Sequence, residues 1–524
     1  MLLFPDERAA LVPDKPAFIM AGSGETVTYG TLVERSRRGA RLMRALGVRA
    51  GDHIALLMEN HPRLLEVAWA AQRAGIRYTP MPARSTVPEC AYLLADCDAR
   101  LLVTTEACRK VAFAARDEVA PDMPLLQVDG TPTPEEDYGA RAAGQPGEPL
   151  DDEEEGSDLL YSGGTTGRPK GIVLDRPRSP IGTPPGFAGL LTELFGFDED
   201  TVLCAPAPLY HSAPLRFTMT VHRAGGTGII MERFDAAALL EVIERHRITH
   251  LKLVPTMFQR LLALPESVRK EADTSSLRAV IHAAAPCPPS VKREVIDWFG
   301  PIVHEFYSST ENYLFTHITS QEWLQRPGSV GRPLSGTPHV LDSDTGQELP
   351  VGSTGTLWSE GGSRFAYRND PAKTAAAYDD RGWTTVGDLG RVDQDGYVYL
   401  VDRSTDLILS GGVNIYPREI EDVLVAHPDV VDVAVFGVPS ARFGEEVKAV
   451  IQPRSNDLAG VALAAALDAH CRAELSPYKC PRSFDFHEAL PRSPTGKLLK
   501  RLLREHYLAP TTDAPHQHET RDEP

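Results

Sequence analysis

Hydrophobic residues in the first part of the chain follow two alternating spacings. Segment 31–46 carries apolar residues at helical intervals, and Gly47 after it favours a helix end. Segments 52–60 and 76–82 are compact apolar runs typical of buried strands, and 61–75 between them has a helical pattern. This strand–helix–strand order predicts a parallel sheet covered by helices.

A second series of the same kind begins at Thr201. Its predicted strands are 201–210, 249–255, 277–285 and 302–309, and its predicted helices are 235–248, 256–265 and 289–300. Segments 9–20 and 25–32 have the pattern of short strands and turns. From about residue 330 the pattern changes to short alternating strands, which predicts a smaller β-rich subdomain.

A new unit begins near Arg403. Downstream the pattern gives a helix, two strands and a further helix, at 417–427, 432–439, 446–453 and 460–475. We therefore predict an α/β protein. An N-terminal domain over 1–402 combines two βαβ-type sheet lobes with the β-rich subdomain, and a small mobile α+β domain covers 403–507. The polar stretch 508–524 is predicted to be a disordered tail.

Charge and composition narrow the class of protein. The formal net charge is −18, which argues against a chain that coats nucleic acid or an anionic membrane. No apolar run is long enough for a membrane span, and the N-terminus does not suit a signal peptide. Seven dispersed cysteines, with no CxxC pair, suggest neither a disulfide framework nor a zinc site. We expect a soluble cytoplasmic protein and leave open whether it forms a homodimer.

The acidic run at 151–155 (DDEEE) has two readings. It could be a metal site, but adjacent carboxylates cannot all point at one ion. We therefore expect a solvated loop.

A glycine-rich loop lies between two apolar strands at 158–174, DLLYSGGTTGRPKGIVL. Glycines let the backbone approach a ligand and turn its N–H groups inward, while hydroxyls and a lysine suit an anionic phosphate. It is not a Walker A loop, because Pro169 precedes the lysine and Gly171 follows it. The candidate phosphate-binding residues are Ser162, Gly163, Gly164, Thr165, Thr166, Gly167 and Lys170.

The segment YSGGTTGRPKG resembles the signature of the adenylate-forming superfamily, which includes acyl-CoA synthetases, stand-alone adenylation domains and luciferases. Further segments match in the same order over roughly residues 20–505: PLYHSAPL (208–215), HAAAPC (282–287), YSSTE (307–311), WTTVGDLG (383–390), the stretch 403–421 and PRSPTGKLLK (491–500). The chain is most similar to an acyl-CoA synthetase. This resemblance implies ATP and CoA as co-substrates and Mg²⁺ as a cofactor.

In the N-terminal domain, the resemblance implies a role for each matched position. His211 lies beside the acyl pocket, and Tyr307 stacks on adenine. Glu311 holds Mg²⁺ together with Thr166, consistent with the preference of this ion for oxygen ligands. The other nucleotide-binding positions are Ala284, Ala285 and Pro286 along the adenine, Ser308, Thr310 at the α-phosphate, and Asp388 and Arg403 at the ribose. Ala283, Ala284 and Ser308 stand where many members have glycine.

The C-terminal domain supplies the remaining positions by the same resemblance. Thr405 is the hinge, where many members have Asp or Lys. Ser410, Gly411 and Gly412 line the pantetheine tunnel. Lys497 bridges the carboxylate and the α-phosphate, stabilising charge in the transition state. Lys500, Arg501 and Arg504 after it are expected to form a basic surface loop.

The expected activity is an acid–thiol ligase that makes acyl-AMP from a lipophilic carboxylic acid and then transfers the acyl group to CoA. Three alternatives stay open. The acceptor could be a carrier protein, the enzyme could perform only thioester formation on supplied acyl-AMP, or the chain could be a non-catalytic acyl-adenylate-binding protein.

Overall fold

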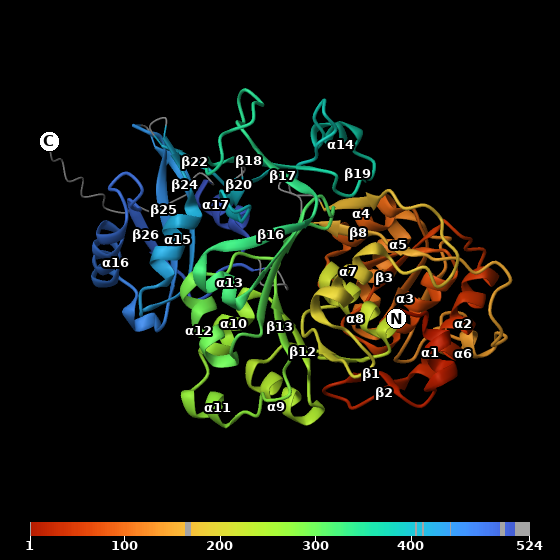
Figure 1. The fold of residues 1–524 in the computed structure, drawn as a ribbon. Helices are drawn as coiled ribbons and strands as arrows, with labels where there is room; N and C mark the ends of the chain where they lie inside the picture. Colours follow the sequence, from red (N-terminus) through yellow and green to blue (C-terminus); the bar gives the residue numbers. More distant parts are fainter. Residues whose placement is uncertain are drawn as a thin grey trace. The chain divides into compact units, whose positions relative to one another are not determined.

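The computed structural model describes residues 2–162, 169–403, 406–410, 413–440, 442–492 and 498–508, and gives the backbone alone at Arg403. The chain divides into two compact units, the first reaching Leu400 and the second beginning at Val401 (Figure 1). No helix in the described part of the chain has the length and apolar character needed to cross a membrane. The α/β class predicted from the sequence is confirmed.

The first lobe of unit 1 is a parallel sheet in the order β6-β5-β3-β4-β7. Its strands are β3 (His53–Leu57), β4 (Arg77–Met81), β5 (Ala99–Thr104), β6 (Leu125–Gln127) and β7 (Ser157–Asp158). Its helices are α1 (Pro5–Leu11), α2 (Tyr29–Ala45), α3 (Pro62–Arg73), α4 (Val87–Cys97), α5 (Arg109–Val119) and α6 (Tyr138–Ala143), with a 3₁₀ turn η1 (Glu106–Cys108). The strand-and-turn prediction for 9–20 is wrong at its start, because residues 9–11 belong to α1.

Local chemistry explains where two of these helices begin. Thr28 caps α2 by accepting a hydrogen bond from the Thr31 backbone N–H. Thr86 and Glu89 form a reciprocal capping box at α4. Gly75, after α3, has φ of +67°, and a Cβ there would lie 2.5 Å from the Glu154 side chain. The turn after α3 therefore requires glycine.

Thirteen strands of the described part form one sheet, in the order β17-β18-β20-β21-β16-β15-β14-β13-β12-β10-β11-β1-β2. The β-rich segment after residue 330 joins the second lobe through β16 pairing with β15. The strands are β1 (Pro16–Met20), β2 (Thr26–Thr28), β10 (Val202–Cys204), β11 (Thr227–Ile230), β12 (His250–Leu253), β13 (Ala279–His282), β14 (Val303–Ser308), β15 (Phe315–Thr319), β16 (Ser329–Ser335), β17 (Thr337–Leu341), β18 (Gly355–Glu360), β20 (Asp388–Val392) and β21 (Val398–Arg403).

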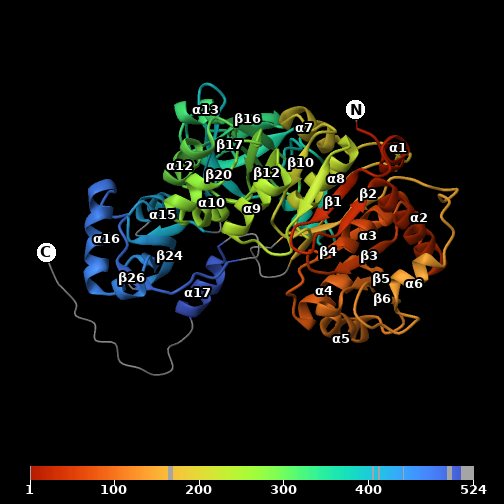
Figure 2. The ribbon, with the colours of Figure 1, turned by 90° about the horizontal axis from the view of Figure 1, so that it is seen from below.

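Helices cover both faces of the central strands of this sheet. α9, α10 and α12 pack on one face of β12 and β13, and α7 and α8 pack on the other, as Figures 1 and 2 show from two directions. The helices of this part are α7 (Gly186–Phe195), α8 (Ser212–Ala224), α9 (Ala236–His246), α10 (Pro255–Leu262), α11 (Glu266–Glu271), α12 (Pro289–Phe299) and α13 (Ser320–Gln325). Each face therefore has its own apolar core.

A small antiparallel sheet, β19-β9-β8, carries the strands on both sides of the glycine-rich loop. Its strands are β8 (Leu160–Ser162), β9 (Lys170–Leu174) and β19 (Phe365–Tyr367), and α14 (Pro371–Ala376) follows β19. Tyr367 pairs in register with Ile172. A segment some two hundred residues downstream of the loop therefore lies beside it.

Unit 2 is a mixed sheet, β23-β22-β25-β24, with β26 added on β25. Its elements are β22 (Ile408–Ser410), β23 (Val413–Ile415), α15 (Pro417–Val425), β24 (Val430–Ser440), β25 (Gly444–Pro453), η2 (Asn456–Leu458), α16 (Val461–Glu474), β26 (Ser483–Phe486) and α17 (Lys500–Leu508). Apart from Leu508, the last residue of α17, the predicted tail lies outside the described residues.

The expectation of a basic surface loop at Lys500, Arg501 and Arg504 is wrong. All three lie in α17. The Lys500 side chain is 13% exposed, and its ammonium lies 2.8 Å from Glu421. Burial lowers the pKa of Lys500, but Glu421, Asp402 and Asp406 outweigh it and raise the pKa above its usual range. The sequence analysis did not predict this helix, because its stability depends on apolar side chains that pack against β24, a distant segment of the chain.

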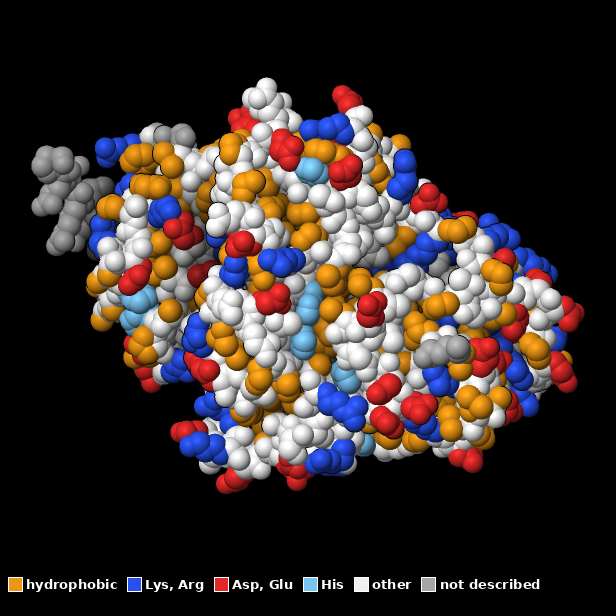
Figure 3. All heavy atoms as spheres, in the orientation of Figure 1, with side chains coloured by type: hydrophobic (Ala, Val, Ile, Leu, Met, Phe, Trp, Pro, Cys, Tyr) orange, Lys and Arg blue, Asp and Glu red, His pale blue; other side chains and the backbone are white. Residues whose placement is uncertain are grey.

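The acidic run at 151–155 is not a solvated loop. Four of its carboxylates pair with arginines, and the side chains of Glu153 and Glu155 are only 13% and 7% exposed. The pairs are Asp152–Arg44, Glu153–Arg73, Glu154–Arg178 and Glu155–Arg223. Elsewhere, acidic and basic side chains are interspersed over the face drawn in Figure 3, so this face shows no single acidic patch.

We predict that Glu155→Ala lowers the free energy of unfolding of unit 1 by about 3–5 kcal/mol, because it leaves the buried Arg223 without its carboxylate. Asp152→Ala is the matched control. Its side chain is 68% exposed, so the expected loss is below about 1 kcal/mol. Urea denaturation measures both variants, and equal losses would contradict the assignment of a buried pair.

Candidate active site

The strands that flank the glycine-rich loop form a hairpin. Ser162 at the end of β8 pairs with Lys170 at the start of β9. The Tyr92 hydroxyl donates to the backbone oxygen of Pro169 at 2.9 Å, which holds this end of the hairpin against α4. The hairpin therefore presents Ser162 and Lys170 at the two ends of the loop. Five predicted loop residues lie outside the described residues: Gly163, Gly164, Thr165, Thr166 and Gly167.

Tyr307 and Asp388, predicted to contact adenine and ribose, are in direct contact. The Tyr307 hydroxyl donates to Asp388 Oδ2 at 2.5 Å and lies 2.5 Å from the Tyr313 hydroxyl. Burial and the neighbouring Asp388 carboxylate raise the pKa of Tyr307 well above its usual value, so its hydroxyl stays protonated. Asp388 is 7% exposed and is oriented from within the fold.

Glu311 and Lys170 both lie next to Tyr367, a tyrosine that the sequence analysis missed. The Tyr367 hydroxyl donates to Glu311 Oε1 at 3.0 Å, and the Lys170 ammonium lies 5.8 Å from the centre of the Tyr367 ring. Tyr367 stands in β19, outside every motif considered above. Its only sequence signal is a short aromatic alternation, FAY, which does not single it out.

Glu311 fits the metal role proposed for it. It is 6% exposed, and the hydrogen bond from Tyr367 engages only one of its two oxygens. Within the described residues, no three His, Cys, Asp or Glu side chains gather to hold an ion. A single carboxylate suits Mg²⁺, which takes most of its other ligands from phosphates and water.

The turn after β13 has the open backbone expected next to a flat ring. Ala284 and Pro286 are exposed, and Ala285 is partly so. Ala284 has φ of +77°, in the left-handed region where a Cβ is unfavourable. Glycine would relieve this strain, which agrees with its frequency at this position in the family that the sequence resembles.

His211 is the residue immediately before α8, and it acts as a neutral side chain. Its ring lies 4.2 Å from that of Tyr210, and its Nε2 is buried with no hydrogen-bond partner in the described structure. Burial lowers the pKa of His211 to about 4. At neutral pH the imidazole is uncharged, so it can line a pocket for an apolar group but cannot supply positive charge.

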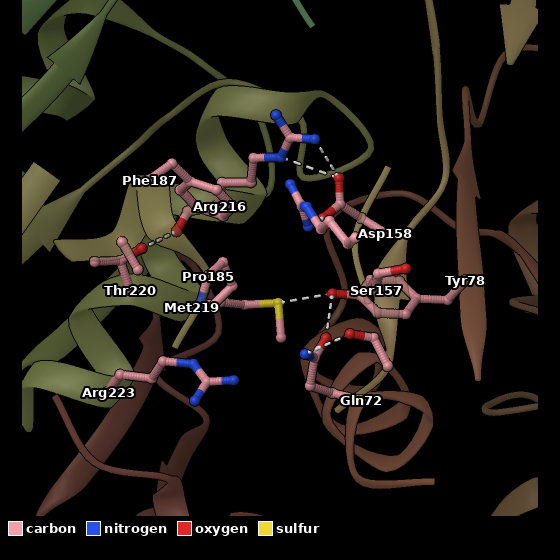
Figure 4. A pocket seen from close by; sticks show the side chains of 13 residues that line it. Gln72, Tyr78, Ser157, Asp158, Pro185, Phe187, Arg216, Met219, Thr220 and Arg223 are labelled. Carbon is pink, nitrogen blue, oxygen red and sulfur yellow. Dashed lines mark hydrogen bonds and ion pairs between the residues drawn. The ribbon is translucent and has the colours of Figure 1, made fainter. Parts of the chain in front are cut away.

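Helix α8 is fixed to the strand that precedes the loop by a buried ion pair. Arg216 donates two hydrogen bonds to Asp158 Oδ2, at 3.0 and 2.7 Å. Figure 4 shows Arg216 pointing at Asp158, and both line a small cavity of about 30 Å³ together with Met219 and Tyr78. Burial raises the pKa of Asp158, but Arg216 and Arg176 outweigh it and hold the pKa below its usual range.

Several predicted residues remain predictions. Ser308 and Thr310 are partly exposed and lie close to Glu311 in the chain. Ser410 ends β22 in unit 2. The Arg403 side chain is not described, and Thr405, Gly411, Gly412 and Lys497 lie outside the described residues.

Comparison with protein families identifies both parts of the chain. Residues 5–366 match the family model of AMP-binding enzymes, and residues 419–497 match that of the AMP-binding enzyme C-terminal domain. Feruloyl-CoA synthase of Amycolatopsis sp is 35% identical over 509 residues, covering 96% of this chain and 98% of that protein. Sulfoacetate–CoA ligase of Cupriavidus necator is 32% identical, covering 95% and 96%.

Solved structures show the same fold. ATP-bound MatB from Rhodopseudomonas palustris aligns with a TM-score of 0.81 at 30% identity, covering 97% of this chain and 99% of that one. An o-succinylbenzoate CoA synthetase from Bacillus subtilis, solved with its acyl-adenylate intermediate, aligns with a TM-score of 0.79 at 25% identity, covering 99% of each.

We predict that Tyr307→Phe weakens ATP binding about tenfold, because it keeps the ring but removes the hydrogen bond that orients Asp388. Calorimetry of ATP binding measures the change. Tyr399→Phe is the control, since the Tyr399 hydroxyl bonds Asp393 at 3.4 Å outside the site. An unchanged Kd in Tyr307→Phe would show that this hydroxyl does not prepare Asp388 for the ribose.

Proposed function

The chain belongs to the AMP-binding enzymes as an AMP-forming acid–CoA ligase, and we propose that it converts a lipophilic carboxylic acid into its CoA thioester through an acyl-AMP. The observation that carries the proposal is the meeting of Lys170, Glu311 and Asp388 around two tyrosines in unit 1. These are the charged groups that a nucleoside triphosphate requires: Asp388 for the ribose, Lys170 for the phosphates and Glu311 for Mg²⁺.

In the first step, a carboxylate oxygen of the acid attacks the α-phosphorus of ATP and pyrophosphate leaves. Asp388 accepts the ribose hydroxyls, and Ser162 and Lys170 bind the phosphates with the loop between them. Mg²⁺ held by Glu311 and Thr166 would disperse negative charge on the departing pyrophosphate. Lys497 stabilises the charge that develops on the α-phosphate.

In the second step, the CoA thiol attacks the acyl carbon and AMP leaves. We propose that the domain beginning near Arg403 turns about Thr405 between the two steps. Lys497 serves the first step, and Ser410, Gly411 and Gly412 serve the second by lining the path of pantetheine. Glycines suit such a path because they leave room for a thin substrate.

The preference for a lipophilic acid rests on the surroundings of His211. Phe217, Ala283 and Phe306 belong to an apolar cluster under the helix that His211 precedes, and His304 and His317 contact the Phe195 ring of this cluster. The neutral imidazole adds no charge to the pocket wall. The relatives act on acids as different as feruloyl and sulfoacetate groups, so the acid must be found by experiment.

An acid panel with ATP and CoA tests this function. We expect aryl and medium- to long-chain acids to give pyrophosphate and thioester, with acetate at least about tenfold slower, because each buried methylene contributes ~0.8 kcal/mol. Pyrophosphate and thioester are measured separately, with a carrier protein as a parallel acceptor. If pyrophosphate is released but thioester forms on the carrier protein alone, the acceptor is the carrier protein and not CoA. Acetate as the best acid would contradict the lipophilic pocket.

We predict that Lys497→Ala lowers acid-dependent pyrophosphate release about a hundredfold or more, because the lysine stabilises charge only in that step. Thioester formation from synthetic acyl-AMP should stay within about threefold of wild type. Lys500→Ala is not a suitable control, since Lys500 forms an ion pair with Glu421. The exposed Lys270→Ala is suitable, and equal loss of both half reactions in Lys497→Ala would refute the assigned role.

A further inference from the structure

Lys252 is a buried lysine that the proposed steps do not use. It lies within β12 and is 3% exposed. Its neighbours Leu251 and Leu253 belong to the core under α9, α10 and α12. Side chains alternate along a strand, so Lys252 points to the opposite face, beneath α7 and α8.

The contacts of the Lys252 ammonium leave most of its hydrogen-bonding capacity unused. It donates to the backbone oxygen of Leu253 at 2.9 Å and lies 5.3 Å and 6.0 Å from the ring centres of Phe306 and Phe217. An ammonium has three donors. Within the described residues, no carboxylate lies within 4.0 Å of it.

Another buried lysine of the same sheet region is treated differently. Lys292 is 1% exposed and lies 2.5 Å from Glu305. This lysine, on α12, therefore has a carboxylate partner within the fold. At Lys252, burial without such a partner lowers the pKa to about 7.

Packing alone favours an apolar residue at position 252. A buried charge without a partner is costly, and a hydrophobic residue of similar volume is often as stable or more so. The two aromatic rings offset only part of that cost. The position therefore suits a lysine that receives its partner from a ligand.

The place of Lys252 in the fold identifies that ligand. Phe306 directly precedes Tyr307, and Ala283 of the same cluster directly precedes Ala284. Phe217 stands on α8, which begins immediately after His211. The cluster around Lys252 thus lies behind His211, which lines the acid pocket in the proposed function, and next to Tyr307 and Ala284, which are expected to contact the adenine.

We propose that Lys252 is a specificity-determining residue of the acid pocket. Its ammonium binds an oxygen at the end of the acid farthest from the reacting carboxylate. The substrate is then an acid with an apolar middle and a second carboxylate or a phenolic hydroxyl at its far end. This inference rests on the proposed ligase function and sharpens it.

Matched acids test the inference, since each pair differs only in the distal oxygen. Hexanoate is compared with hexanedioate, octanoate with octanedioate, and cinnamate with 4-hydroxycinnamate, with thioester formation as the readout. We expect wild type to favour the oxygen-bearing member of at least one pair by about tenfold or more in kcat/KM, the size of a buried charge-assisted hydrogen bond. The aliphatic and aromatic pairs distinguish a distal carboxylate from a phenol.

Lys252→Met, which keeps length and volume, should lose this preference, because kcat/KM falls more for the oxygen-bearing member of each pair than for the unsubstituted acid. Its midpoint of urea unfolding should not fall, because the methionine side chain suits the cluster. Lys270→Met, at an exposed site on α11, is the control that removes a charge from the surface. Lys252→Arg should retain a preference for the distal oxygen, though with altered preferred length.

Two results would overturn the inference alone. One is thioester formation at equal rates for both members of every pair in wild type, a readout that needs no variant. The other is a Lys252→Met enzyme in which both members fall by the same factor, which indicates a purely structural lysine. No thioester or pyrophosphate from any acid would instead overturn the ligase function on which the inference rests.

Discussion

Buried ion pairs hold the segment that leads into the glycine-rich loop, and the arrangement of the site depends on them. Glu155 binds Arg223, and Asp158 binds Arg216, both from α8. Gly156 between the two acids has no room for a Cβ, which would lie 2.4 Å from a backbone oxygen of Ile76. The segment is therefore fixed against both the first lobe and α8, so the loop and His211 keep a defined relation. Removing one partner of such a pair is far costlier than removing a surface charge.

The nucleotide site is assembled by side chains whose positions in the sequence are far apart. Tyr307 reaches Asp388, and Tyr367 joins Glu311 to the neighbourhood of Lys170. These tyrosines donate hydrogen bonds to carboxylates that have to face an anionic ligand. At Glu311, the hydrogen bond from Tyr367 to Oε1 fixes the orientation of the carboxylate. The hydrogen bonds from the tyrosines thus keep the acidic side chains in fixed orientations next to the proposed anionic ligand.

The proposed acid pocket differs from the proposed nucleotide site in that most of its surroundings are uncharged. Burial lowers the pKa of His211 to about 4, and the apolar cluster behind it contacts Lys252 and three histidines, His250, His304 and His317. A single ammonium in such surroundings discriminates strongly, since water cannot compensate for a missing partner there. Under our proposal, this one buried charge selects among acids that share the same nucleotide chemistry, whereas Lys292 has its partner Glu305 within the fold.

The sequence by itself determined the α/β class, most helices and strands, and the glycine-rich loop, whereas the roles expected for the other matched residues rest on the resemblance to the adenylate-forming superfamily. These features depend on local periodicity or on short runs such as the glycine-rich loop, whose chemistry is legible without neighbours. The tertiary structure decided which charges are paired. It showed that the acidic run at 151–155 forms ion pairs, that Lys500 pairs with Glu421 from a helix, and that Tyr367 contacts Glu311. Among the described residues, it showed no carboxylate paired with Lys252. Burial and pairing depend on segments brought together from distant parts of the chain, so the identity of a charged residue does not reveal whether water or another side chain surrounds it.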